Sequence, residues 1–86
     1  MDTNPMKLDL LKNIMAGDII DIDEGVIGTV VFNAISEDYS EEFPIEDWGG
    51  EANNGIMIQQ ENGALLFHDL EYLLTDYCRI SVVETK

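Results

Sequence analysis

The sequence lacks basic residues over most of its length. The lysine and arginine residues, four in all, lie near the two ends: Lys7, Lys12, Arg79 and Lys86. Between Asn13 and Cys78 there are fifteen acidic residues and no lysine or arginine, and the whole chain has a formal net charge of -14 with His68 taken as neutral. Such a surface repels nucleic acid and anionic membranes and attracts basic partners over about one Debye length, ~8 to 10 Å. We therefore expect no direct binding to nucleic acid or to a membrane.

Cysteine is almost absent as well. Cys78 is the only one, so no intramolecular disulfide can form, and small domains without disulfides are typical of a reducing compartment. No segment approaches the roughly 18 consecutive apolar residues that indicate a membrane span. The N-terminal residues also lack the basic start and continuous apolar run of a signal peptide. These absences predict a cytoplasmic protein.

Groups that perform catalysis or hold cofactors are scarce. His68 and Cys78 are the only imidazole and thiol, and thiolate activation needs an electropositive setting that this chain does not offer. One His and one Cys also cannot supply a closed zinc site. Gly25 and Gly28 belong to no phosphate-binding loop, because a third glycine and a lysine are missing. We expect no enzyme activity and no cofactor.

One group of carboxylates has the composition of a metal site: Asp18, Asp21, Asp23 and Glu24. An EF-hand loop needs glycine at its sixth position and a glutamate at its twelfth. Counting from Asp21 places Gly25 at the fifth position and Phe32 at the twelfth, so the pattern fails. Weak adventitious calcium binding stays open as an alternative, and no metal centre is expected.

Although strongly acidic, the chain has the composition of a folded domain. Apolar residues make up 45% of its 86 residues and occur in patterned runs, whereas disordered chains have low hydrophobicity. We expect residues 1–86 to form a single acidic domain. Its first element is a helix over about 5–15, followed by two strands over 18–32 with a tight turn at Glu24-Gly25.

The strongest local pattern lies in the second half of the chain. Asn62-Gly63 between two strand-like runs predicts a β-hairpin over 56–68 with a type I′ turn. Asp69 is expected to cap a short helix that precedes a last strand over 79–83. Five short strands with an N-terminal helix and a short helix before the last strand predict an α+β fold. It is either a small five-stranded antiparallel sheet or a half-open SH3-like or OB-like barrel.

The longest polar stretch, residues 33–55, is the main candidate for a binding site. We expect a long acidic loop whose carboxylates contact a basic partner while its aromatic side chains act as apolar anchors. The candidate residues are Glu37, Asp38, Tyr39, Glu41, Glu42, Phe43, Glu46, Asp47, Trp48 and Glu51. The alternative is a solvated loop whose aromatic residues fill the core, and the sequence leaves both open.

The small size, the acidic charge and the lack of catalytic residues resemble two groups of acidic inhibitors. These are immunity proteins that neutralise bacterial toxins, often basic nucleases, and phage proteins that mimic DNA. The resemblance implies a non-enzymatic protein with a basic protein partner, either a toxin or a nucleic-acid-binding protein. Uneven charge clusters favour the immunity protein, because a DNA mimic spaces its charges like a phosphate backbone.

A small structural or adaptor module is the remaining alternative. Such a module self-associates through the edge of the hairpin or through the first helix. It predicts a homodimer that is insensitive to salt, whereas the inhibitor is expected to be a monomer that binds its partner in a salt-dependent way.

Overall fold

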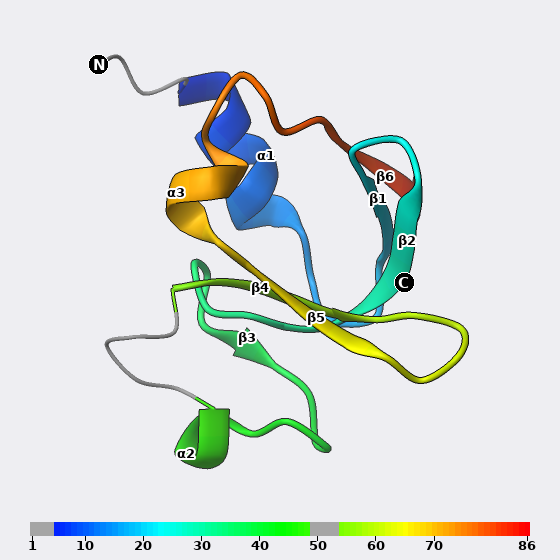
Figure 1. Cartoon of the computed structure of the whole chain (residues 1–86). Helices are drawn as coiled ribbons and strands as arrows, with labels where there is room; N and C mark the ends of the chain where they lie inside the picture. Colours follow the sequence, from blue (N-terminus) through cyan, green and yellow to red (C-terminus); the bar gives the residue numbers. More distant parts are fainter. Residues whose placement is uncertain (1–4, 49–53) are drawn as a thin grey trace.

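The computed structural model describes residues 5–48 and 54–86. In chain order the elements are α1 (Pro5–Asn13), β1 (Ile19–Ile22), β2 (Val26–Asn33), β3 (Asp38–Tyr39), α2 (Ile45–Trp48), β4 (Gly55–Gln59), β5 (Leu65–Asp69), α3 (Leu70–Leu73) and β6 (Ile80–Glu84). Over these described ranges they form an α+β fold around a six-stranded antiparallel sheet (Figure 1). The strand order is β5-β4-β2-β1-β6, with β3 paired to β2 outside this path. The sheet is open, and β5 and β6 are its edges.

The central strand is β2, and it changes neighbours along its length. Residues 26–29 pair with β1, residues 29–33 pair with β4, and Phe32 and Asn33 also pair with β3. The register with β4 shifts between Val30 and Phe32, which marks a bulge. Bulges bend a strand and increase its twist, and Figure 1 shows β2 curving from the side of β1 toward β3 and β4.

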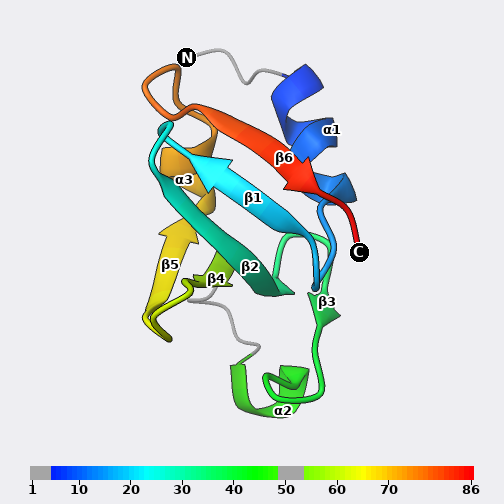
Figure 2. The same ribbon diagram turned by 90° about the vertical axis from the view of Figure 1, so that its right-hand side faces the viewer.

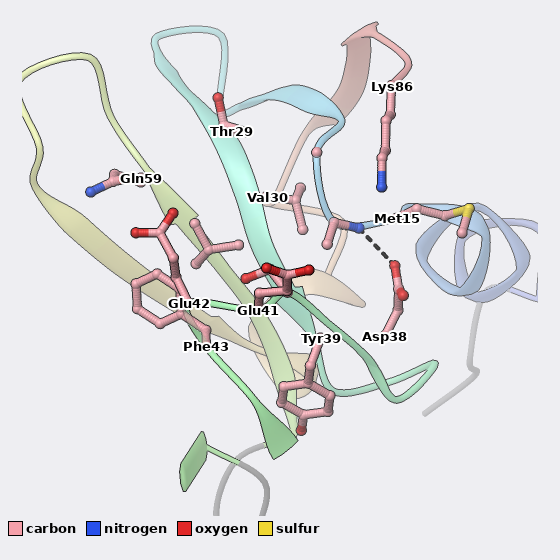
Figure 3. Close-up of a pocket in the computed structure, with 14 residues that line it drawn as sticks. Met15, Thr29, Val30, Asp38, Tyr39, Glu41, Glu42, Phe43, Gln59 and Lys86 are labelled. Atoms are coloured by element: carbon pink, nitrogen blue, oxygen red, sulfur yellow. Dashed lines mark hydrogen bonds between the residues drawn. The ribbon is translucent and has the colours of Figure 1, made fainter. Parts of the chain in front are cut away.

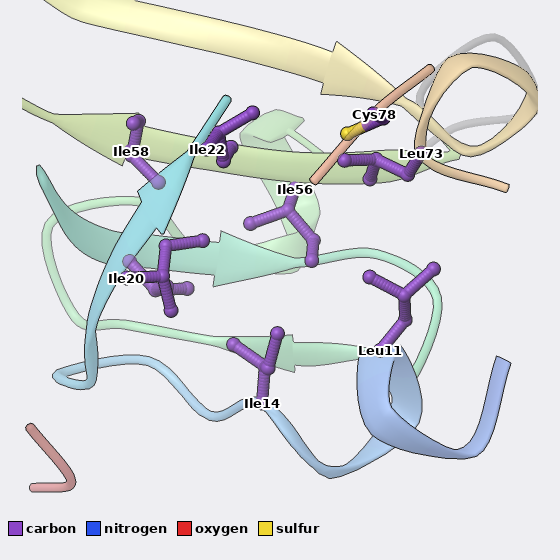
Figure 4. Close-up of a cluster of buried hydrophobic side chains, with 9 residues drawn as sticks. Leu11, Ile14, Ile20, Ile22, Ile56, Ile58, Leu73 and Cys78 are labelled. Carbon is purple, nitrogen blue, oxygen red and sulfur yellow. The ribbon is translucent and has the colours of Figure 1, made fainter. Parts of the chain in front are cut away.

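The main hydrophobic core lies between α1, α3 and one face of the sheet (Figure 4). Its fully buried side chains include Leu11 from α1, Ile20 from β1, Ile56 from β4 and Leu73 from α3. Burial of each such side chain contributes about 1.5 to 3 kcal/mol relative to exposure. A smaller second cluster, centred on Phe32, lies with Val31 and Met57.

Helix α1 ends at Asn13, two residues before the end that the sequence pattern predicts. The carbonyl oxygens of Leu11 and Ile14 each accept a hydrogen bond of 2.8 Å from the side-chain amide of Asn33. Because this amide satisfies carbonyl groups at the end of the helix, no further helical turn is needed to pair them. The chain therefore leaves the helix and turns into β1.

The β4-β5 hairpin turns in a different way from the type I′ turn that Asn62-Gly63 predicts. Gly63 has a positive φ of 92°, whereas Asn62 is not among the residues with positive φ. The Gly63 amide donates to the Gln60 carbonyl at 2.8 Å, and the Asn62 side chain accepts from the Ala64 amide at 3.0 Å. A type I turn followed by a glycine bulge has this geometry. The Asn62 side chain thus stabilises a turn in which it keeps ordinary φ.

Residues 33–55, which the sequence predicts as a loop, contain regular structure in their described part. The segment begins with the last residue of β2, includes β3 and α2, and ends with the first residue of β4. Strand β3 is the strand that the five-stranded prediction lacks, and it pairs Tyr39 with Phe32 and Asp38 with Asn33. In both ribbon views α2 lies at the end of the molecule far from α1 (Figures 1 and 2).

The turn between β1 and β2 contains two residues with unfavourable backbone dihedral angles, and a substitution with glycine should relieve this strain. Asp23 and Glu24 have positive φ, 58° and 56°, a region that disfavours side chains with a Cβ atom. We expect Glu24→Gly to raise the free energy of unfolding by about 0.5 to 1 kcal/mol, measured by urea denaturation. Glu24→Gln, which keeps the Cβ but removes the exposed ion pair with Arg79, should change it by less than about 0.5 kcal/mol. If both variants changed the free energy of unfolding equally, the positive φ of Glu24 would not be the cause of the destabilisation.

Candidate functional site

The acidic segment, defined as residues 37–47, presents most of its carboxylates to solvent. The exposed ones are Glu37, Glu41, Glu42, Glu46 and Asp47. None of them makes a salt bridge within the described residues. The ion pair found there joins Arg79 to Glu24, at 4.0 Å, and lies outside the acidic segment. An exposed carboxylate without a neighbouring cation keeps its full charge available to an incoming partner. These five side chains are therefore the accessible part of the predicted binding set.

Asp38 has a structural role instead. Its side chain is half-buried, and its carboxylate accepts a hydrogen bond of 2.7 Å from the Ala16 amide, 22 residues away in the sequence. This bond fixes β3 to the segment that joins α1 to β1. Asp38 thus positions the acidic segment rather than standing free on its surface.

Tyr39 and Phe43 anchor the acidic segment to the sheet. The Tyr39 ring stacks on Phe32, with ring centroids 5.1 Å apart and an angle of 18° between the planes. Both Tyr39 and Phe43 are half-buried against the cluster that contains Val31, Phe32 and Met57. Burial, with a smaller effect of Glu37, raises the pKa of the Tyr39 hydroxyl. The sequence left open whether these aromatic side chains bind a partner or fill the core. Each ring is partly buried and partly exposed, so its position is compatible with both roles.

Two predicted residues cannot be placed. Glu51 lies outside the described residues, and the side chain of Trp48 lies outside the described side chains, although its backbone ends α2. The acidic segment as used below therefore contains neither residue.

A groove of about 490 Å³ runs beside the acidic segment (Figure 3). We call it the acidic groove. One wall carries Glu41 and Glu42, and the rings of Tyr39 and Phe43 lie on the same side. Figure 3 shows the Glu41 carboxylate near the middle of the view and the Glu42 carboxylate nearer Gln59, with Lys86 on the opposite side. Protein interfaces are enriched in aromatic residues at their centre and have polar residues at their rim.

The opposite wall of the acidic groove was not predicted from the sequence. It comes from residues 15–17, from residues 29–31 of β2 and from Lys86. The Gly17 amide donates to the Val30 carbonyl at 2.8 Å, which sets this wall against β2. The sheet pairing brings these three segments, which are far apart in the sequence, next to one another. No local sequence pattern indicates that they are neighbours.

Several other carboxylates are occupied by backbone hydrogen bonds. Asp18 is buried and accepts from the amides of Met15 and Lys86 at 2.9 and 2.8 Å. Asp21 accepts from the Gly25 amide at 2.9 Å, which closes the β1-β2 turn. These residues belong to the group that the sequence offered as a metal candidate. In the structure their carboxylates bind backbone amides at turns and so stabilise the fold.

Asp23 completes this structural group. It accepts from the Arg79 amide at 3.1 Å and from the hydroxyl of Tyr72, so it links the β1-β2 turn to α3 and β6. The bond to Asp23 raises the pKa of Tyr72 to about 12. The same bond, together with that from the Arg79 amide, lowers the pKa of the Asp23 carboxyl. Asp18, Asp21 and Asp23 thus bind the backbone at turns, whereas the five exposed acids of the acidic segment have no such hydrogen bond among the described residues.

Lys7 also serves the fold. Its ammonium group donates to the carbonyl oxygens of Thr75 and Cys78 at 2.7 and 2.5 Å, which fastens α1 to the segment after α3. Lys7 and Arg79 are therefore engaged on the side of the molecule that carries α1 and β6. They do not neutralise the acidic segment.

His68 and Cys78 do not form a catalytic pair in the described structure, where no hydrogen bond joins them. Burial raises the pKa of the Cys78 thiol, which opposes formation of the thiolate. Burial also lowers the pKa of His68, an effect that Asp23 and Asp69 partly offset. Its Nδ1 atom is shielded from solvent and has no hydrogen-bond partner. Burial thus favours the neutral form of both groups.

The lowered pKa of His68 predicts a pH dependence of stability. The ordinary His pKa is 6.5, and the folded protein binds the proton less readily than the unfolded chain. Its contribution to stability is therefore complete above pH 6.5 and is lost as the pH falls through the folded pKa. Urea denaturation at about pH 8 and about pH 5.5 should show that the wild type loses stability relative to His68→Leu. A difference between the two proteins that does not change with pH would contradict this assignment.

The described residues contain no group of three or more His, Cys, Asp or Glu side chains arranged to hold a metal ion. Among the helices in the same part of the chain, none has the length and apolar character needed to cross a membrane.

Neither the protein-family models, nor the curated proteins, nor the solved structures gave a match to this chain.

Proposed function

We propose that this chain is a non-enzymatic acidic binding protein that neutralises a basic protein partner. In its most specific form, the proposal is an immunity protein that inhibits a bacterial toxin such as a nuclease, in the cytoplasm. The supporting observation is the set of five exposed carboxylates of the acidic segment, none of which has an ion-pair partner in the described structure. A nuclease binds phosphates with Lys and Arg, and an array of carboxylates can occupy the same positions.

The way in which the acidic segment is held also supports an inhibitor. Glu41 and Glu42 stand on a backbone that is held by Asp38 and Tyr39 on one side and by Phe43 on the other. A preorganised charged surface loses less entropy on binding than a flexible one. These contacts hold residues 38–43, which carry Glu41 and Glu42, against the sheet, and this supports an inhibitor.

Affinity capture tests this proposal. The immobilised protein is incubated with lysate of its source cells at low salt and washed at about 0.5 M sodium chloride, where the Debye length falls below ~5 Å. A basic protein should be retained at low salt, released at high salt, and inhibited in its own activity by the purified chain. Retention of proteins without basic surfaces, or retention that salt does not change, would contradict the proposal.

A second candidate function has one observation in its favour. Strand β6 is an edge of the sheet, and its Val82 and Val83 side chains are exposed. Exposed edge strands with apolar residues can pair with a second copy, as an adaptor module would. Size-exclusion chromatography at several concentrations separates the two functions: a dimer that salt does not affect favours the adaptor, and a monomer favours the inhibitor.

The finer fold class, an SH3-like or OB-like half-open barrel, stays a prediction. The bend of β2, which pairs with β1 at one end and with β3 and β4 at the other, is the feature that supports it. Small barrels use such bends where a strand passes from one side to the other.

A further inference from the structure

The acidic groove has the size and the lining of a site for a side chain. Its volume of about 490 Å³ lies within the range of about 300 to 1,000 Å³ that ligand pockets occupy. Its lining includes the buried Val30 and Val31 and the half-buried rings of Tyr39 and Phe43. The exposed carboxylates of Glu41 and Glu42 stand at its opening. The groove thus offers apolar surface for a side-chain stem and negative charge for its end.

Lys86 places one positive charge at the rim of the acidic groove. Its backbone amide donates to Asp18 at 2.8 Å, and its side-chain stem lies over Gly17, where an added Cβ would come within 2.8 Å of Lys86 Cδ. Its ammonium group makes no salt bridge with a carboxylate of the described residues. The charge is therefore close to the groove without being paired to it, and it opposes the entry of another cation.

We propose that the acidic groove takes one arginine or lysine side chain from an extended segment of the basic partner. The stem lies along Tyr39 and Phe43, and the charged end meets Glu41 and Glu42. This inference rests on the proposed function and names the contact through which it works. Long basic side chains lay their stems on apolar surface, and cations are attracted to the faces of aromatic rings. Arginine suits the site better than lysine, because its planar group both stacks on rings and pairs with carboxylates.

The test uses an eight-residue fluorescent peptide of alternating arginine and valine. A second peptide replaces arginine with citrulline, which keeps the shape and removes the charge. Binding is measured by fluorescence anisotropy and is located by amide chemical shifts of the isotope-labelled protein. The arginine peptide should shift amides that line the acidic groove, and the citrulline peptide should not. Glu41→Gln/Glu42→Gln should weaken binding about fivefold or more, because the matched cation then lacks both partners.

Two further variants make the test specific. Glu61→Gln/Glu71→Gln removes the same charge from exposed positions outside the acidic segment and should leave the affinity nearly unchanged. Lys86→Met keeps the stem over Gly17 and removes the charge, so it should tighten binding about two- to threefold at low salt. Unchanged amide spectra in the absence of peptide will show that all variants are folded.

The outcomes separate this inference from the proposed function. Binding could be salt-sensitive and yet shift amides outside the acidic groove, or be weakened equally by both double variants. Either result would overturn the proposal that the groove is the binding site, and it would leave a general acidic binding surface. Absence of any charge-dependent binding would overturn the groove and would also count against the proposed function, which affinity capture tests separately.

Discussion

Asn33→Asp should destabilise the protein by about 3 to 5 kcal/mol, because it leaves a buried carboxylate facing two carbonyl oxygens. Asn33 is fully buried. Its side-chain amide donates to the carbonyls of Leu11 and Ile14, and its oxygen accepts from the Ile35 amide at 3.0 Å. Aspartate has the same shape but cannot donate when ionised. Small domains have only about 5 to 15 kcal/mol of stability, so a large part of it would be lost.

Urea denaturation at neutral pH measures this loss, and Asn13→Asp is the matched control. Asn13 makes one exposed hydrogen bond, to the Asp9 carbonyl at 2.8 Å. Its replacement should change the free energy of unfolding by no more than about 1 kcal/mol, mainly through the unfavourable charge at the end of α1. The Asn33→Asp variant should also recover stability as the pH falls and the new carboxyl group binds a proton. Similar losses in both variants would contradict the role assigned to Asn33.

Gly55→Ala should destabilise the protein by about 2 to 3 kcal/mol, because no space exists for the added methyl group. A Cβ at Gly55 would lie 2.1 Å from the His68 carbonyl oxygen and 2.8 Å from Asp69 Cα. Both are backbone atoms of the paired strand β5, so β4 and β5 would have to separate at this end. The separation would also strain the hydrogen bond of 2.8 Å from the Ala34 amide to the Gly55 carbonyl.

Gly25→Ala is the matched control for this prediction. The nearest atom to a Cβ at Gly25 is the Asp23 carbonyl oxygen, 4.0 Å away, so the methyl group meets no obstacle. Thermal unfolding of the two variants should therefore give a much lower Tm for Gly55→Ala than for Gly25→Ala. Equal melting temperatures would show that the close approach of the two strands is not required.

Local signals in the sequence were enough to indicate several elements. Asn62-Gly63 marks the β4-β5 hairpin, and Asp69 caps α3 by accepting from the Tyr72 amide at 2.9 Å. These features depend on residues that lie within a few positions of one another. Even so, the hairpin turn has a different geometry, because the Asn62 side chain pairs with Ala64 and removes the need for positive φ at Asn62.

Features that depend on distant residues could not be predicted in the same way. Asn33 looked like the start of a loop, yet it is the buried end of β2 and joins that strand to α1. Asp38 looked like one more surface charge, yet it binds the Ala16 amide. Strand β3 is two residues long and carries no periodic pattern that would reveal it. Each of these contacts arises from the order of strands in the sheet, which the sequence pattern does not specify.

The central claim is that the acidic segment, and not the acidic composition as such, binds the basic partner. The direct test compares two variants with the same net charge. One reverses four charges in the segment: Glu41→Lys, Glu42→Lys, Glu46→Lys and Asp47→Lys. The other reverses four exposed charges elsewhere: Asp9→Lys, Glu61→Lys, Glu71→Lys and Asp76→Lys. The measurement is the dissociation constant of the captured partner at physiological salt.

The account predicts that reversal within the acidic segment weakens binding by about 100-fold or more, since four contacts each become repulsive. Reversal elsewhere should weaken binding less than about tenfold, through the long-range field alone. Equal losses in the two variants, or unchanged affinity after reversal within the acidic segment, would contradict the account.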